Sequence, residues 1–229
     1  LNPNGGIEAD LTVTCVDKNL FRVISGAAVR THDKKHILNN LKFDVEFNDI
    51  TEELACLGIF GPKSRELLTE LVGNEFDNER FPFGTGKYLK IQGISIWFQR
   101  LSYVGELGWE IYIPMKNAKK IYDAITETGK NYELIHAGAH AMDIMRMEKM
   151  YLHWGHDISP EENPYEAGLG FAVRLNKEED FIGKKALKNI NQDQLTKKMI
   201  MLTLVDSIPG DPLLLHDEPI FYEEAIIGE

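Results

Sequence analysis

The chain has very little cysteine, and this scarcity limits the kinds of protein that it can be. Only Cys15 and Cys56 occur among 229 residues, and each lies in an apolar, strand-like run. We therefore expect two buried free thiols rather than a disulfide framework or a catalytic nucleophile. A reducing compartment fits this cysteine usage.

Positive charge and long apolar runs are also scarce. The net charge is −11 at pH 7, and lysines form only short pairs, which we expect to be solvated. An acidic background of this kind disfavours a nucleic-acid surface. No apolar run approaches the ~20 residues that a membrane-spanning helix needs, so we expect neither nucleic acid nor membrane as a partner. The lysine pairs are 34–35, 119–120, 184–185 and 197–198.

The sequence also lacks the usual patterns for a metal or a dinucleotide. The pairs His136/His140 and His153/His156 have neither the glutamate of a His-Glu-x-x-His site nor a third ligand at a useful spacing. Gly5-Gly6 leads into a strand-like run and not into the N-terminus of a helix, where a phosphate would bind. We therefore predict no metal site and no dinucleotide site.

The remaining composition is that of an ordinary globular protein with a good core. Hydrophobic residues make up 43% and charged residues 27%, enough for one large domain or two to three small subdomains. Periodicity predicts an α+β fold. The expected strands cover 11–16, 21–25, 44–47, 54–60, 87–91, 94–101 and 109–113, and the expected helices cover 33–41, 62–73, 118–129 (capped by Asn117) and 139–151.

Residues 99 to 114 contain the most informative pattern. Gly105 and Gly108 bracket a tight turn, after which an alternating strand puts Glu110 and Tyr112 on one face and only apolar residues on the other. A carboxylate on a rigid strand, with Tyr103 just before the turn, suits a flat heterocycle that offers two parallel N–H donors. The alternative is a solvated edge strand of a hairpin.

Four stretches, taken together and in order, resemble one family. The turn Tyr-x-Gly-Glu-x-Gly-x-Glu, residues 103–110, is similar to the signature of the glycine-cleavage T-protein (aminomethyltransferase) family. It is equally similar to the folate domain of dimethylglycine and sarcosine dehydrogenases. The other matching stretches are 1–13, 142–149, and 163–170 with 180–187.

The resemblance implies a T-protein-like folate-binding fold, with three subdomains around a central folate cavity. Residues 1–50 would end the first subdomain, 51–194 would form a ferredoxin-like α+β subdomain, and 195–229 would supply the opening strands of a C-terminal β-barrel. Pro209-Gly210, Pro212 and Pro219 would break this last part into short strands. Members of the family have further strands on both sides, so the chain looks truncated at both ends.

The resemblance also implies a function, namely transfer of a one-carbon unit onto tetrahydrofolate to give 5,10-methylenetetrahydrofolate. The catalytic aspartate of the family corresponds to Asp10, which on local pattern alone would be a simple strand-edge acid. Such chemistry needs a carboxylate that takes up a proton or holds a developing cation. The folate contacts carried over from the family are Leu11, Thr12, Tyr103, Glu110, Ile111 and Tyr112.

One departure favours the dehydrogenase branch of the family. Met142 stands where glycine-cleavage enzymes have a folate-binding arginine. The expected partners are an amine-derived one-carbon donor and either a covalently linked FAD domain or a lipoyl carrier protein. The implied location is cytoplasmic, or the mitochondrial matrix in a eukaryote. Arg146 and Glu148 point to different faces of their helix, and we expect Arg146 to form a structural ion pair with Asp143.

Two other functions remain open from the sequence. One is a non-catalytic folate-binding or regulatory module, as in the pyruvate dehydrogenase phosphatase regulatory subunit, which shares this domain. The other is a folate-dependent demethylase that takes a methyl group from a sulfonium or ether donor. The acid at Asp10 favours the transferase over both.

Overall fold

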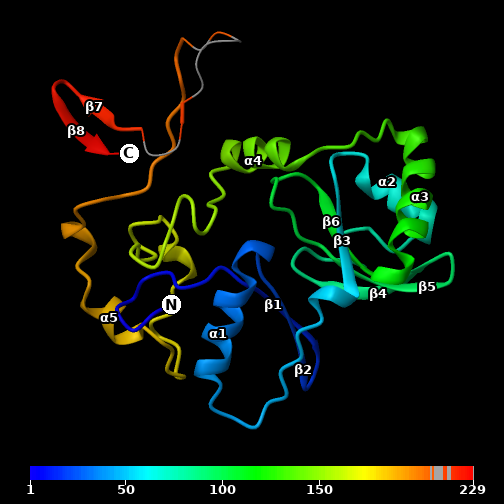
Figure 1. Cartoon of the computed structure of the whole chain (residues 1–229), viewed down its shortest axis with the longest axis horizontal. Coiled ribbons are helices and arrows are strands. Elements are labelled where there is room, and N and C mark those ends of the chain that lie inside the picture. Colours follow the sequence, from blue (N-terminus) through cyan, green and yellow to red (C-terminus); the bar gives the residue numbers. More distant parts are fainter. Residues whose placement is uncertain (207, 209–213, 216–217, 229) are drawn as a thin grey trace. The chain divides into compact units, whose positions relative to one another are not determined.

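The computed structural model describes residues 1–206, 208, 214–215 and 218–228. The chain divides into two units, Leu1–Lys198 and Met199–Glu229. The first unit contains a four-stranded sheet, a separate β-hairpin and five α-helices (Figure 1). This mixture of helices and strands confirms the α+β prediction. None of the helices in the described residues has the length and apolar character that crossing a membrane requires.

The four-stranded sheet is antiparallel throughout, with the strand order β3-β6-β5-β4. Strands β4 and β5 are joined by a two-residue turn at Gln92 and Gly93, whose φ angles are 49° and 80°. Positive φ at both central residues is what a tight hairpin turn requires, and glycine adopts it at little cost. The strands are β3 (Leu54–Phe60), β4 (Gly86–Ile91), β5 (Ile94–Gln99) and β6 (Gly108–Pro114).

The hydrophobic core lies between one face of this sheet and two helices, α2 (Ser64–Val72) and α3 (Ala118–Gly129). Trp109 of β6 is fully buried there, and Phe76 packs edge-on against it with ring centroids 5.2 Å apart. The other apolar residues of β6 are fully buried in the same core, which confirms the alternation predicted for this strand. Its polar residues therefore face the opposite side of the sheet.

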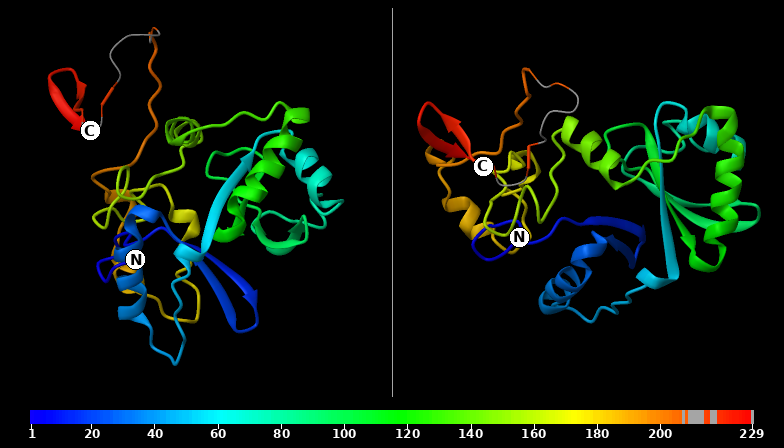
Figure 2. Two further views of the ribbon diagram at one scale, coloured as in Figure 1. Left: turned by 45° about the vertical axis from the view of Figure 1, so that its right-hand side comes forward. Right: turned by 45° about the horizontal axis from the view of Figure 1, so that its top comes forward.

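The opposite face of the sheet is covered by a β-hairpin made of β1 (Thr12–Asp17) and β2 (Leu20–Ile24). The Thr14 hydroxyl donates to the Gln99 side chain at 3.3 Å. The Arg22 guanidinium lies 4.4 Å from the centre of the Trp97 ring. Because of this cover, Trp97 and Gln99 are almost completely buried. In both views of Figure 2, α1 (Arg30–Asn40) and the hairpin lie away from α2 and α3, with the sheet between them.

Several local predictions are corrected by the structure. Residues 44–47 form no strand, since the sheet offers them no partner. Helix α4 (Ala139–Glu148) ends before Tyr151, and Asn117 forms no side-chain cap because a 3₁₀ turn precedes α3. The remaining elements are α5 (Lys184–Asn189) and 3₁₀ turns at Ala27–Val29, Thr51–Glu53, Met115–Asn117, Lys130–Tyr132, Gly170–Ala172 and Gln192–Gln194.

The two cysteines are free, as predicted, but the prediction that they are buried is wrong, because both are solvent-exposed. Cys15 lies on the outer face of the hairpin, opposite Phe21, where nothing in the first unit covers it. Cys56 lies on the hairpin side of the sheet, opposite Tyr112. Although part of the residue is exposed, the surrounding protein displaces water from its thiol, and this effect, followed by the negative charge of Glu110, raises the pKa of Cys56 to about 11.

The second unit contains an antiparallel hairpin of β7 (Ile220–Tyr222) and β8 (Ala225–Gly228). The proline breaks expected at Pro209-Gly210 and Pro212 lie outside the described residues, whereas Pro219 directly precedes β7. The division of the chain at residues 50 and 194 stays a prediction.

Candidate functional site

The segment that leads to Asp10 is fixed by an unusually complete set of hydrogen bonds. The Asn2 side-chain oxygen accepts from the backbone N–H groups of Asn4 (3.0 Å) and Gly6 (2.9 Å), while its amide nitrogen donates to the Pro160 carbonyl (3.0 Å). Further along, the Trp154 indole N–H donates to the Ile7 carbonyl at 2.7 Å. The segment therefore cannot move without breaking its contacts to the loop at 154–162.

Gly6 is required by the closeness of this contact. A Cβ atom at position 6 would lie 1.8 Å from the carbonyl oxygen of Pro160, which is a backbone atom that cannot rotate away. We expect Gly6→Ala to lower the free energy of unfolding by about 1–3 kcal/mol, the usual cost of overpacking. Gly26→Ala is the matched control, since its Cβ would meet only Val29 at 3.5 Å. Equal urea midpoints for the two variants would contradict this account of the contact.

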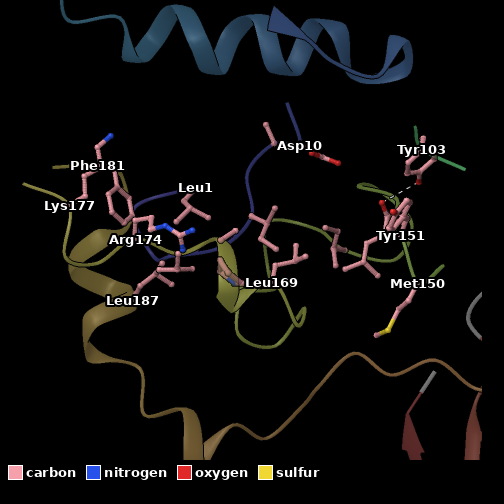
Figure 3. Close-up of a pocket in the computed structure, with 17 residues that line it drawn as sticks. Leu1, Asp10, Tyr103, Met150, Tyr151, Leu169, Arg174, Lys177, Phe181 and Leu187 are labelled. Atoms are coloured by element: carbon pink, nitrogen blue, oxygen red, sulfur yellow. Dashed lines mark hydrogen bonds between the residues drawn. The ribbon is translucent and has the colours of Figure 1, made fainter. Parts of the chain in front are cut away.

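A cavity of about 650 Å³ opens beside this segment (Figure 3). Asp10 reaches it from the N-terminal segment and Tyr103 from the loop between β5 and β6, so the fold brings together two predicted site residues that are distant in sequence. Most of the other lining residues are apolar. They are Leu1, Ile7, Ala9, Met150, Tyr151, Leu152, Ile158, Pro164, Leu169, Ala172, Val173, Arg174, Lys177, Phe181 and Leu187.

Asp10 has an electrostatic environment that favours its neutral form. It keeps access to solvent, but the surrounding protein removes part of its hydration, and this desolvation, followed by the charge of Asp33, raises the pKa of Asp10. Asp33, on α1, is buried, and its Oδ2 atom has no hydrogen-bond partner within the described residues. A carboxyl group that holds its proton to higher pH than usual is well suited to proton transfer.

His32 connects Asp33 to the N-terminal segment. Its Nδ1 lies 3.0 Å from Asp33 Oδ1, and its Nε2 lies 3.2 Å from Glu8 Oε1. The imidazole ring also packs on Trp154, with ring centroids 5.1 Å apart. These contacts join α1 to the segment that carries Asp10 and so fix the carboxyl group against the cavity wall.

Tyr103 is held in place at the cavity by its hydroxyl group, which donates to the Leu152 carbonyl at 3.2 Å (Figure 3). Burial raises the pKa of this phenol, so it stays protonated at any physiological pH. The ring is only partly buried and lines the cavity.

Glu110 and Tyr112 lie together but outside the set of residues that line the cavity. The Tyr112 hydroxyl donates to Glu110 Oε2 at 2.5 Å. Gly58 lies opposite Glu110 on the neighbouring strand, and the Phe60 ring occupies the place that a side chain at residue 58 would take. On the other side Glu110 is paired with Gln99, which also receives the hydrogen bond from Thr14 of the hairpin.

The other predicted folate contacts are placed differently from one another. Leu11 and Thr12 follow Asp10 directly and are partly buried where the hairpin begins. Ile111 is fully buried in the core on the far face of the sheet, so a ligand on the Glu110 side could meet only its backbone. The structure thus puts Asp10 and Tyr103 at one cavity and Glu110 and Tyr112 under the hairpin.

Arg146 organises the wall of the cavity that follows α4. Its Nε donates to Asp143 at 2.7 Å, which confirms the predicted ion pair, and its Nη1 donates to Tyr151 O at 3.1 Å and to Asp157. The side chain is 6% exposed. The hydrogen bond from Arg146 lowers the pKa of Asp143, so both groups stay charged at neutral pH. The loop that supplies Tyr151 and Leu152 to the cavity is therefore fixed by a buried cation.

Sequence reasoning missed the basic end of the cavity. Arg174, Lys177 and Phe181 line it, and no residue pattern of the 171–181 stretch distinguishes them from surface residues. Lys184 was expected on a solvated face but is buried, with its ammonium group bonded to backbone carbonyls, which corrects that prediction. Its place directly after Gly183 was the available signal, because the glycine lets the chain turn its next side chain inward.

Among the described residues, no group of three or more histidine, cysteine, aspartate or glutamate side chains could hold a metal ion. His153 and His156 pack ring against ring, 4.4 Å apart, beside the Arg146 network. The polar and charged side chains that line the cavity are those of Asp10, Tyr103, Tyr151, Arg174 and Lys177.

Comparison with known proteins identifies the family. The model of the GCVT N-terminal domain matches residues 1–177. The chain belongs to the GCVT family. The match includes Asp10, Tyr103, Glu110 and the Arg146 network, and it confirms the resemblance read from the four sequence stretches.

Relatives of this GCVT-family chain include dehydrogenases and aminomethyltransferases. Human mitochondrial dimethylglycine dehydrogenase is 36% identical over 232 residues, which is 100% of this chain and 26% of the relative. Human mitochondrial sarcosine dehydrogenase is 35% identical, with 91% of this chain and 24% of the relative covered. An aminomethyltransferase of Caldanaerobacter subterraneus subsp. tengcongensis is 35% identical, with 99% of this chain and 59% of the relative covered.

Among solved structures, the glycine cleavage system aminomethyltransferase T from Bartonella henselae superposes with a TM-score of 0.69 at 24% identity. The match covers 82% of this chain and 50% of that one, and it confirms the T-protein-like fold. The chain spans about a quarter of the length of the dehydrogenases that it matches. It is thus an aminomethyltransferase-like domain of the kind that occurs both in dehydrogenases and in aminomethyltransferases.

Proposed function

We propose that this domain binds tetrahydrofolate and transfers a one-carbon unit to it from an amine-derived donor, giving 5,10-methylenetetrahydrofolate. The observation that carries the proposal is that Asp10, which the sequence resemblance matches to the family's catalytic aspartate, lines a largely apolar cavity of about 650 Å³ together with Tyr103. That volume is in the range of small-molecule sites, which place a few polar groups among apolar walls.

In this proposal Asp10 is the acid–base group. Tetrahydrofolate, when bound, supplies the amine nitrogen to which the one-carbon unit is joined. The bond between the one-carbon unit and its donor amine would break as the bond to the folate nitrogen forms, so the amine leaves. The proton that the folate nitrogen loses would pass to the departing amine through a nearby base, and the Asp10 carboxylate is the single carboxylate among the residues that line the cavity. Partial burial makes the carboxylate a stronger base than a free aspartate, because its pKa is raised. The same negative charge would stabilise an iminium-type donor before transfer.

We further propose that Glu110 holds the flat pterin ring by two parallel hydrogen bonds from its aminopyrimidinone edge. The Tyr112 hydroxyl already donates to one carboxylate oxygen, which fixes the orientation of the group. Leu11 and Thr12 at the start of β1 and the backbone of Ile111 would complete this end of the site. Tyr103 would pack against the ring from the cavity side.

The donor belongs to the proposal as well. Met142 occupies the position where glycine-cleavage enzymes have an arginine, and this favours a donor made by a covalently linked FAD amine-oxidising domain over one carried by a lipoyl protein. The similarity to dimethylglycine and sarcosine dehydrogenases supports this choice. A mitochondrial matrix location in a eukaryote, or a cytoplasmic one otherwise, is proposed on the same grounds.

Replacing the proposed pterin ligand tests the binding half of the proposal. We expect Glu110→Gln to weaken binding of tetrahydrofolate about ten- to a hundredfold, because a neutral amide replaces a carboxylate that accepts two hydrogen bonds from the ligand. Isothermal titration calorimetry on the parent protein and the variant measures this. Glu106→Gln is the matched control, since Glu106 lies in the same turn and faces Lys149 at 3.8 Å. Equal affinities of the Glu110 and Glu106 variants would exclude Glu110 as the pterin ligand.

A further inference from the structure

The charged groups of the cavity are separated along its length. Asp10 lies at the middle near Tyr103 and Tyr151, whereas Arg174 and Lys177 lie together at the other end (Figure 3). The chain as a whole has a net charge of −11, so two neighbouring cations on one cavity wall are not expected from its composition alone. Although residues 178–180 are all acidic, none of them belongs to the lining of the cavity. The loop therefore places its basic side chains, and not its acidic ones, at the cavity wall.

The loop that carries these cations is fixed by a buried lysine. Lys184 is 9% exposed, and its ammonium group donates to the carbonyls of Lys177 at 2.5 Å and Glu179 at 3.2 Å. The same ammonium lies 5.7 Å from the centre of the Phe181 ring. A buried lysine is costly unless it is satisfied in this way, so the backbone around Lys177 is held in one conformation, with a further positive charge beneath it.

The two cavity cations are themselves little neutralised. Arg174 donates through Nη1 to the Phe171 carbonyl at 2.5 Å, which orients the guanidinium group, and no carboxylate among the described residues forms an ion pair with it. Lys177 lies 3.9 Å from the Glu179 carboxylate, a long and exposed pair. Exposed pairs of this kind contribute little, so Lys177 keeps most of its capacity to bind an anion.

We propose that Arg174 and Lys177 form a carboxylate-binding subsite that receives the glutamyl tail of the folate. This inference rests on the proposed function and adds the direction in which the ligand lies in the cavity. The lining is mostly apolar, with Leu1 and Leu169 between Asp10 and the cations and with Phe181 and Leu187 beside the cations (Figure 3), which suits the aromatic linker between pterin and glutamate. Carboxylates are bound well by the guanidinium group of arginine, which can donate two parallel hydrogen bonds, and by the ammonium group of lysine.

A carboxylate of an amino-acid donor is the other source of the same chemistry, and the experiment separates the two. Isothermal titration calorimetry is carried out with 5-formyltetrahydrofolate, with the analogue that ends at the benzoate and lacks glutamate, and with N,N-dimethylglycine. The proteins are the parent, the double variant Arg174→Glu/Lys177→Glu, and the control Lys185→Glu. Lys185 is exposed, is close in sequence, and does not line the cavity.

We expect the parent and Lys185→Glu to prefer the glutamate form about ten- to a hundredfold, and the double variant to lose this preference. The preference should also shrink as salt is raised, since exposed charges are screened. If the parent does not bind folate, the proposed function is overturned. If the parent binds folate and the double variant keeps the preference for the glutamate form, the tail subsite is overturned and the proposed function stands. The same holds if the double substitution weakens only the binding of dimethylglycine.

Discussion

Asp10→Asn should lower the rate of 5,10-methylenetetrahydrofolate formation roughly 10²–10⁴-fold while leaving tetrahydrofolate affinity nearly unchanged. The amide keeps the shape of the side chain but can neither accept the proton nor stabilise a cation. The measurement is product formation from an aminomethyl or iminium donor, made with the intact-length enzyme and with excess folate. Asp17→Asn, at the exposed end of the hairpin, is the control. Equal rates for Asp10→Asn and the parent would dismiss Asp10 as the acid–base group and revive the binding-module hypothesis.

The same substitution should increase stability at neutral pH. Because the pKa of Asp10 is raised in the folded protein, the folded state holds its proton more tightly than the unfolded state does. The favourable contribution of the protonated group is complete below the ordinary aspartate pKa of ~3.9 and is lost as pH rises through the folded pKa. Asp10→Asn should therefore melt at a higher temperature than the parent near pH 7, and the difference should shrink at low pH. Rate and stability would then change in opposite directions.

Arg146→Met should produce the largest loss of stability, about 3 kcal/mol, and should open the cavity wall after α4. Methionine fills much of the space but leaves the Tyr151 carbonyl unbonded and places the carboxylates of Asp143 and Asp157 side by side without a cation. Removing one partner from a buried ionic network typically costs 3–5 kcal/mol. Two of the partners here are partly exposed, which puts the expected value at the lower end.

Arg80→Met is the matched control for this substitution. Arg80 makes the same i,i+3 ion pair, with Asp77 at 2.9 Å, and also donates to a backbone carbonyl, but its side chain is 59% exposed. An exposed pair of this kind contributes less than about 1 kcal/mol. Urea denaturation of both variants measures the difference, and a similar midpoint for the two would contradict a structural role for the Arg146 network.

Local patterns predicted those parts of the fold in which one interaction dominates. Strand β3 begins and ends at the predicted residues, and the alternation in β6 correctly separated its polar and apolar faces. The strand expected at 44–47 is absent because a strand needs a partner, which a local pattern does not supply. For the same reason, an apolar run at Cys15 could not show that one face of its hairpin remains uncovered.

The site was predictable only to the extent that it resembles a family. The resemblance pointed to Asp10 and Tyr103, and the fold does bring these two to one cavity. Arg174 and Lys177 were missed because their role depends on which residues of an irregular loop turn inward. The Lys184 ammonium group fixes this loop through bonds to the backbone carbonyls of Lys177 and Glu179, and Gly183 just before it is the only sign of this interaction in the sequence.

The docking of the β1–β2 hairpin has a consequence for how a ligand would be held. Asp10 leads into the hairpin, whereas Glu110 belongs to the sheet beneath it, and polar contacts of Thr14 and Arg22 join the two. Elements attached by a few polar contacts open locally more often than a packed core does. A ligand that touches both carboxylates would bind only the docked form, so its observed affinity scales with the fraction of molecules in which the hairpin is docked. Residues that hold the hairpin against the sheet, Arg22 above all, would then change the affinity through that fraction even where they make no contact with the ligand.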